Sequence, residues 1–339
     1  MGVLFFFLTV LVIPGLPSGA LVGRWALLMV ASALLYFAAE LSWWACALLA
    51  YLWLMTWWAP NGYDALYLLF HAYCFVVLYA YAKHLVSLRA IAVGVGLGFA
   101  LNSLVVIGQE FWGAQFIPQL TPDAGLFFNR NVATEGAAMG LALVVAYKMW
   151  WLVPGFIPSL VWGSRSPMVA LGVMSLLMAW QRSRLLALGL FTACIALAYF
   201  WLQKHGVVAD YTTFPLETLQ QRLWVWYDGM EGFTVFGQGL GSWLTNFPLY
   251  QRHSSPLELR WENAHNDAVQ LAFEFGVVGI GFVALFALRL ATAVRGPAFY
   301  ALVVFAVESL FEFPLYDPLT GALAAICAGY LFSRSPGLY

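Results

Sequence analysis

The residues best suited to chemistry lie at one junction of the chain, where a polar stretch meets a long apolar segment. His265 stands there, followed by Asn266 and Asp267. An imidazole exchanges protons near neutral pH, so a histidine at an aqueous boundary could serve as a general base. The alternative is a histidine that caps the helix, paired with nearby Glu262. Asn263 and Asn266 flank the ring and could orient it or hold a substrate hydroxyl.

The composition indicates that membrane helices must position this junction. Of the 339 residues, 63% are hydrophobic and only 9% are charged, whereas soluble domains carry about 25% charged residues. Sixteen Trp and sixteen Tyr residues fit the aromatic belts of a membrane protein. The net charge of −1 gives no sign of a nucleic-acid partner. We therefore predict an all-α polytopic protein that has the lipid bilayer as its surroundings.

Apolar runs separated by short polar stretches predict about twelve transmembrane helices in a single integrated membrane domain. Residues 1–202 would form the N-terminal helices, residues 203–263 one long loop carrying short helices, and residues 264–339 the C-terminal helices. The first run lacks a basic leader, so we expect it to be a retained helix. The predicted spans are 2–15, 23–39, 41–58, 63–82, 88–110, 132–147, 149–163, 166–180, 185–202, 264–288, 297–312 and 318–333.

The lysines and arginines of short connections predict the orientation. Eight fall on the side opposite the long loop and three on the loop side, which places the loop outside and both termini in the cytoplasm. Arg24, Arg130 and Arg165 are the three on the outer side, which also bears His265. Each could simply snorkel to the interface, or together they could hold an anion, since an arginine fork suits phosphate. The eight are Lys83, Arg89, Lys148, Arg182, Arg184, Arg289, Arg295 and Arg334.

The long loop offers further candidates. Residues 219–226 have the pattern of a short amphipathic helix, in which Arg222 could pair with a neighbouring glutamate (Glu217 or Glu231). Trp226 could rest on the membrane or stack on a sugar. The glycines of 237–241 lack the strand–turn–helix context of a nucleotide site. They predict a tight turn in which Gly239 lets the backbone approach a ligand closely or is only flexible. We interpret His253 as a surface histidine.

The motifs that are missing narrow the chemistry. The sequence has no HExxH, no clustered His and Cys residues, no GxSxG and no P-loop. We therefore predict no metal and no cofactor. A transporter or flippase for lipid-linked glycans is the competing class, since many helices and outer arginines fit it too. Such proteins show internal repeats and intramembrane charges, and this sequence shows no matching halves and few charges within its spans.

Six elements, taken in order, resemble the O-antigen ligase and polymerase superfamily, which includes bacterial protein O-oligosaccharyltransferases. The most specific is Ala264-His265-Asn266-Asp267, continued by Gln270-Leu271 and by two glycines at 276 and 279. In the protein-glycosylating branch a histidine usually precedes the serine of the last element, whereas this chain has Glu308. The other five are Phe127 to Asn131, Ser164-Arg165-Ser166, Arg222 to Trp226, Gly237 to Gly241, and Ser309 to Leu315.

The resemblance implies a GT-C-like membrane glycosyltransferase in the bacterial inner membrane, with its site facing the periplasm. The donor would be a glycan on undecaprenyl pyrophosphate, and the reaction would be inverting and metal-independent. The acceptor would be lipid A-core, as in an O-antigen ligase; a growing glycan (polymerase) or a protein hydroxyl are the alternatives. His265 would be the base, and Arg222 and Arg165 would hold the diphosphate. The remaining substrate-binding residues would be Arg130, Arg24, Asn266, Asn263, Trp226 and Gly239.

Overall fold

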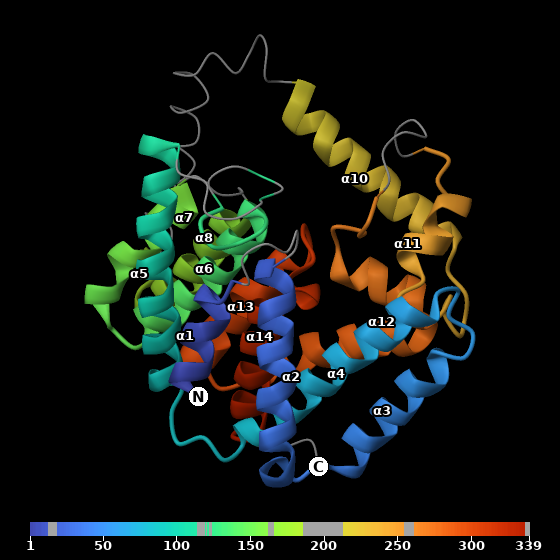
Figure 1. The fold of residues 1–339 in the computed structure, drawn as a ribbon, viewed down its shortest axis with the longest axis horizontal. Coiled ribbons are helices and arrows are strands. Elements are labelled where there is room, and N and C mark those ends of the chain that lie inside the picture. Colours follow the sequence, from blue (N-terminus) through green and yellow to red (C-terminus); the bar gives the residue numbers. More distant parts are fainter. Residues whose placement is uncertain are drawn as a thin grey trace.

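The computed structural model shows a chain built of helices (Figure 1). It describes residues 1–12, 19–113, 119, 121, 124–161, 166–185, 213–253 and 261–335, and within these ranges there is no β-strand. The N-terminal elements are α1 (Gly2–Val10), α2 (Gly19–Ala39), α3 (Trp43–Met55), α4 (Gly62–Ala82), α5 (Arg89–Trp112), α6 (Arg130–Ala146), η1 (Trp150–Phe156), α7 (Ile157–Val161) and α8 (Ser166–Arg182). The later elements are α10 (Thr213–Glu231), α11 (Trp243–Asn246), η2 (Phe247–Leu249), α12 (Asp267–Thr292), α13 (Pro297–Glu308), η3 (Pro314–Tyr316) and α14 (Pro318–Phe332).

The helices follow the predicted apolar runs. Each predicted span coincides with a helix except 185–202, which lies outside the described residues apart from Leu185. Among the described residues, four helices are long and apolar enough to cross a membrane: Leu21–Ala39, Gly62–Ala82, Arg89–Trp112 and Asp267–Thr292. Others are apolar but shorter, such as Pro297–Glu308 and Pro318–Phe332. The chain is thus a helical membrane protein, and the count of about twelve crossings stays a prediction.

The core forms where these helices cross. α1 packs along α5, α4 along α2 and α14, and α6 and α8 along α13. Small residues permit the close approach, as in other membrane helix pairs. A side chain at Gly98 would meet Thr9, and one at Gly140 would meet Val95 and Phe156. The buried side chains of these helices join in one continuous cluster, which fixes the helix ends that carry the polar residues.

Helix α12 is two helices joined at a break. Gly276 has φ 59° and ψ −135°, a conformation that interrupts the helix and that glycine adopts most readily. The residues from Gln270 to Gly276 are buried, whereas several residues after the break, such as Val277 and Ile280, are exposed at the surface. The predicted span 264–288 is therefore not one continuous helix, because Gly276 divides it.

Candidate functional site

His265 lies just before α12 and outside it. Asn266 caps this helix, since its Oδ1 accepts hydrogen bonds from the backbone N–H groups of Ala268 (3.0 Å) and Val269 (3.1 Å). The short carboxamide fits this task better than an imidazole, so the expectation of a capping histidine is wrong. His265 has φ +50°, in the left-handed region that non-glycine residues seldom occupy. Its backbone therefore does not continue the helical geometry of the residues that follow it.

Contacts on both sides hold the backbone of His265 in this conformation. The indole N–H of Trp226 on α10 donates to the carbonyl of Ala264 (2.9 Å). The Ala264 N–H donates to the side chain of Gln270 on α12 (3.0 Å). The Asn266 side chain donates to the carbonyl of Leu310, in the connection between α13 and α14 (3.3 Å). A strained conformation fixed by three elements is typical of a functional position.

The partner of the His265 ring is Glu312. The ring Nδ1 lies 2.9 Å from Glu312 Oε2, so the predicted partner Glu262 is wrong. The Glu312 side chain is only 3% exposed, while that of His265 is 24% exposed. With the Nδ1 proton donated to the carboxylate, Nε2 carries a lone pair that can accept a proton. The edges of Trp261 and Phe313 flank the ring.

Glu312 also binds two further elements. Arg222 on α10 donates to Glu312 Oε1 at 3.1 Å and to the carbonyl of Phe311, and Ser166 at the start of α8 donates to the same carboxylate oxygen at 3.3 Å. Arg222 therefore pairs with Glu312, whereas Glu231, one of its two predicted partners, pairs with Arg252. We call His265, Glu312, Arg222 and Ser166 the His265 site.

The electrostatics of the His265 site favour a charged carboxylate. Burial of Glu312 opposes its ionisation, but the hydrogen bond from His265 and the positive charge of Arg222 outweigh burial and hold the pKa of Glu312 below its ordinary value. A negative Glu312 fixes the ring orientation of His265 and would stabilise an imidazolium. The site is therefore suited to take a proton from a neighbouring hydroxyl group.

The connection that carries Glu312 is fastened by the residue after the cap. Asp267 accepts hydrogen bonds from the Ser309 hydroxyl (2.8 Å) and the Leu315 N–H (3.2 Å), and its own N–H donates to the Ser309 carbonyl (2.9 Å). The His-Asn-Asp motif thus supplies the reactive ring together with two residues that position its partner. Sequence analysis missed Glu312 as a site residue, and the motif from Ser309 to Leu315 was the signal that contained it.

Two further carboxyl groups lie behind Glu312. Glu135 on α6 and Glu308 on α13 are fully buried, and their carboxylate oxygens have no hydrogen-bond partner among the described residues. Glu308 is one helical turn before Glu312, since the Glu312 N–H donates to its carbonyl. Both interact electrostatically with Glu312. Glu308 is therefore a buried glutamate close to Glu312 in the chain that makes none of the hydrogen bonds of Glu312 to His265, Arg222 and Ser166.

The predicted arginines are not brought together in one cluster. Arg130 begins α6 near the buried Glu135, and its side chain is exposed and pairs with no carboxylate among the described residues. Arg165 lies outside the described residues. Arg222 is 17% exposed and turned toward Glu312. Of the three that the structure describes, Arg130 is the one that is open to a soluble anion.

Arg24 has a structural role that the sequence did not reveal. Its guanidinium is buried, donates to the carbonyls of Thr9 (2.8 Å) and Leu126 (3.0 Å), and stacks 3.7 Å over the Phe127 ring. It therefore ties α1 and α2 to the connection before α6. These contacts hold the guanidinium inside the fold, and substrate binding by Arg24 stays a prediction.

The glycine turn approaches the break in α12. The N–H groups of Gln238 and Gly239 donate to the carbonyls of Phe273 (2.9 Å) and Glu274 (3.1 Å), which the break frees from helical bonding. Gly239 has φ +105° and faces the backbone of Ala59. The close approach at Gly239 is thus to the chain itself, and binding of a substrate there stays a prediction.

The other two predicted substrate-binding residues lie near the ring. Trp226 is half-buried and uses its N–H to hold Ala264, so it positions the His265 backbone instead of lying on the membrane. Asn263 is half-buried in the bend before His265, and its side chain makes no hydrogen bond with the described residues. The Asn263 side chain is therefore available to a substrate, whereas the indole N–H of Trp226 is already used in its hydrogen bond to Ala264.

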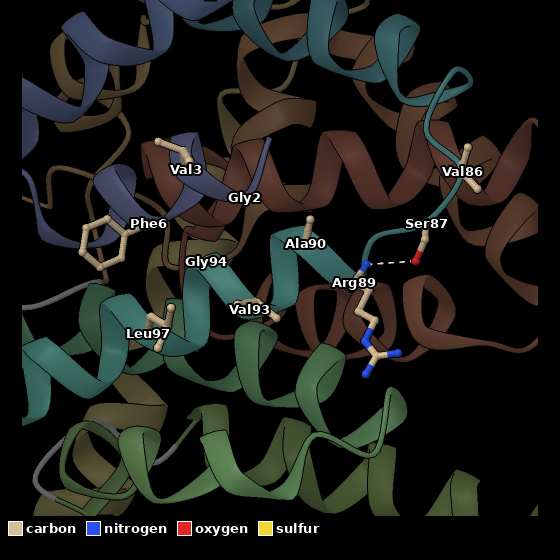
Figure 2. A pocket seen from close by; sticks show the side chains of 10 residues that line it. All are labelled: Gly2, Val3, Phe6, Val86, Ser87, Arg89, Ala90, Val93, Gly94 and Leu97. Atoms are coloured by element: carbon tan, nitrogen blue, oxygen red, sulfur yellow. Dashed lines mark hydrogen bonds between the residues drawn. The ribbon is translucent and has the colours of Figure 1, made fainter.

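A surface hollow lies elsewhere, between α1 and α5 (Figure 2). Its lining is apolar except for Ser87 and Arg89 at the start of α5. Small residues, Gly2 and Gly94 among them, shape it. None of the residues of the His265 site lines it, and its chemistry is that of a surface facing lipid. We therefore place the functional site at His265 and not at this hollow.

Comparison with known proteins gives no family. No family model matches the chain, and no curated protein sequence matches it. A functional proposal therefore rests on the geometry of the His265 site and on the order of the sequence motifs.

Proposed function

We propose that the chain is a membrane glycosyltransferase that moves a glycan from undecaprenyl pyrophosphate to an acceptor hydroxyl. The observation that carries the proposal is the contact between His265 and Glu312 (2.9 Å), backed by Arg222 on the same carboxylate. A histidine held by a buried carboxylate is the arrangement that general-base catalysis on a hydroxyl requires. Its place between a polar loop and an apolar helix suits a substrate whose phosphates lie at headgroup depth.

In the proposed reaction His265 Nε2 takes the proton of the acceptor hydroxyl while its oxygen attacks the anomeric carbon. The bond from that carbon to the diphosphate oxygen breaks, and the electron pair leaves with the lipid diphosphate. Attack opposite the leaving group inverts the anomeric centre. Glu312 stabilises the imidazolium, which then releases its proton to solvent on its exposed side.

The leaving diphosphate needs positive charge, and no metal or cofactor is part of the proposal. Arg130 and Arg165 are proposed to bind it directly, since an arginine fork matches two phosphate oxygens. Arg222 contributes nearby positive charge while it fixes Glu312. The side chains of Asn263 and Asn266 lie beside the ring; Asn263 is proposed to bind the acceptor, while Asn266 holds the helix start.

The setting of this reaction is also a proposal. It comprises about twelve membrane crossings in a GT-C-like arrangement, the bacterial inner membrane, a site facing the periplasm and cytoplasmic termini. The acceptor proposed is lipid A-core, as in an O-antigen ligase. Support comes from the motif order and from Glu308, which stands where the protein-glycosylating branch usually has histidine.

A complementation experiment tests the proposal. A host strain lacking its own copy receives the wild-type gene, His265→Ala or His84→Ala, where His84 is an exposed histidine outside the site. We expect His265→Ala to lower glycan attachment by on the order of 10²-fold or more, and His84→Ala to restore it. Normal attachment by His265→Ala at matched expression would falsify the base assignment. Unchanged glycoconjugates after deletion of the gene would overturn the function itself.

A further inference from the structure

A second histidine–carboxylate pair lies on the polar segment that carries α10. His253 Nδ1 is 2.7 Å from Asp228 Oδ1, and Asp228 Oδ2 accepts hydrogen bonds from the N–H groups of Arg252 and His253 (3.0 Å each). Asp228 is fully buried, whereas the His253 side chain is 42% exposed. The carboxylate therefore fixes the ring, and Nε2 is the nitrogen left for another molecule.

Two aromatic side chains complete this cluster. The Trp224 ring is stacked on the His253 ring with centroids 5.2 Å apart and planes at 21°. Tyr227 meets the same ring edge-on at 5.2 Å. Both aromatic residues are exposed. We call Trp224, Tyr227, Asp228 and His253 the His253 site.

The His253 site and Arg222 lie on different faces of one helix. Trp224 follows Arg222 by two residues, which is about 200° around an α-helix. Asp228 lies one turn beyond Trp224, on the same face. A helix with its side chains is about 10–12 Å across. A single ligand that reached from Arg222 to the His253 site, on opposite faces of α10 (Figure 1), would therefore have to be an extended chain.

From this arrangement we propose that the His253 site binds a pyranose unit of the donor glycan, several sugars away from the reacting end. A pyranose has an apolar C–H face, which fits an exposed aromatic ring, and ring hydroxyls, which need a fixed polar partner such as His253 Nε2. The buried Asp228 pre-orients that partner, which lowers the entropic cost of binding. That the pyranose belongs to the donor glycan rests on the proposed function. That the ligand is a pyranose rests on the side chains of the His253 site.

Binding of a free oligosaccharide tests the proposal independently of transfer. The probe is the oligosaccharide released by mild acid from the undecaprenyl-linked glycans of the host. The protein is the full chain carrying His265→Ala in lipid nanodiscs, and the readout is calorimetric Kd. We expect Trp224→Leu and His253→Gln each to weaken binding about threefold to tenfold. Trp112→Leu, which removes an exposed tryptophan at the end of α5, should leave the Kd unchanged.

Two results would overturn the proposal. One is the same Kd for the parent, Trp224→Leu and His253→Gln, and the other is no binding by the parent. A membrane role for Trp224 is tested in nanodiscs containing brominated phospholipid. The bromine atoms quench the fluorescence of tryptophans that contact the lipid, and we expect the Trp224→Phe variant to be quenched as much as the parent. A measurable decrease in quenching would show that Trp224 contacts the membrane and would contradict the proposed sugar site.

Transfer by the wild-type chain is measured separately, so the two proposals can fail independently. Binding that depends on Trp224 in a chain without transferase activity would support the sugar site and contradict the proposed function. Transfer by the wild-type chain, together with an oligosaccharide Kd that Trp224→Leu does not change, would support the proposed function and contradict the sugar site.

Discussion

The described parts of the chain contain two histidine–carboxylate pairs of nearly the same internal geometry. In each, the ring Nδ1 contacts a buried carboxylate oxygen, at 2.9 Å for His265 and Glu312 and at 2.7 Å for His253 and Asp228. In each, the carboxylate leaves Nε2 as the nitrogen that can react or bind. The pair alone therefore does not define a catalytic site.

The surroundings of the two pairs differ in charge. Glu312 also binds Arg222 and Ser166, so a cation lies beside the carboxylate. Asp228 instead accepts backbone N–H groups, and its histidine is stacked face to face on the exposed Trp224 ring, whereas both aromatic rings beside His265 meet it edge-on. Of the two histidines, His265 has the left-handed backbone. These differences support the two proposals, in which the first pair transfers a proton and the second binds a sugar.

Removal of the carboxylate charge gives the largest expected contrast. We expect Glu312→Gln to lower kcat by on the order of 10²-fold, because the amide neither holds the productive tautomer nor stabilises an imidazolium. Glu308→Gln is the matched control, since Glu308 is equally buried but its carboxylate has no hydrogen-bond partner in the part of the chain that the structure describes. Rates of transfer by purified proteins measure both. Equal losses in the two variants would indicate a general effect of buried acids and remove the distinction between them.

Exchange of arginine for lysine is expected to have a smaller effect. Arg222→Lys keeps the charge but loses the two-point contact with Glu312 and the Phe311 carbonyl, and we expect on the order of tenfold lower kcat/KM. Arg252→Lys changes an exposed pair, in which the arginine is 68% exposed, and should stay within about twofold. Steady-state kinetics decide between them. An Arg222→Lys enzyme as active as the wild type would show that the guanidinium geometry is not needed.

The smallest effect concerns stability at acid pH. The folded-state pKa of Glu312 lies below the ordinary value of 4.5. Its contribution to stability is therefore complete above about pH 4.5 and is lost as the pH falls through the folded-state pKa. We expect the melting temperature to decline over that range, and to decline less in Glu312→Gln. Glu110→Gln, at an exposed carboxylate near the end of α5, should keep the wild-type profile. Identical profiles for all three would contradict a charged Glu312.

The parts of the fold that depend on local sequence were predictable. Apolar runs located the helices, because a membrane helix is recognised from its own residues. The residues 219–226 proved to be part of a longer helix, α10. The break at Gly276 was missed, because it is stabilised by backbone hydrogen bonds with residues 235–239, which precede it by some forty positions. A contact between distant segments leaves no periodic signal in either one.

The same reasoning explains the site. His265 was identified because it stands at a visible boundary between polar and apolar sequence. Glu312 was not assigned to the site, because the partner of a histidine is set by packing and not by spacing. Arg24 was assigned to the outer face by counting charges, a method that reports the side of the membrane but not burial. Arg130 remained as exposed as predicted.

The most direct test of the account compares two histidines in single-turnover transfer by the purified full chain in nanodiscs, with the lipid-linked donor prebound. We predict that His265→Ala slows the transfer step by at least about 10²-fold while donor binding is kept. The matched variant His84→Ala should transfer at the wild-type rate. A folded His265→Ala protein that transfers the glycan as fast as the wild type would contradict the assignment of His265 as the base.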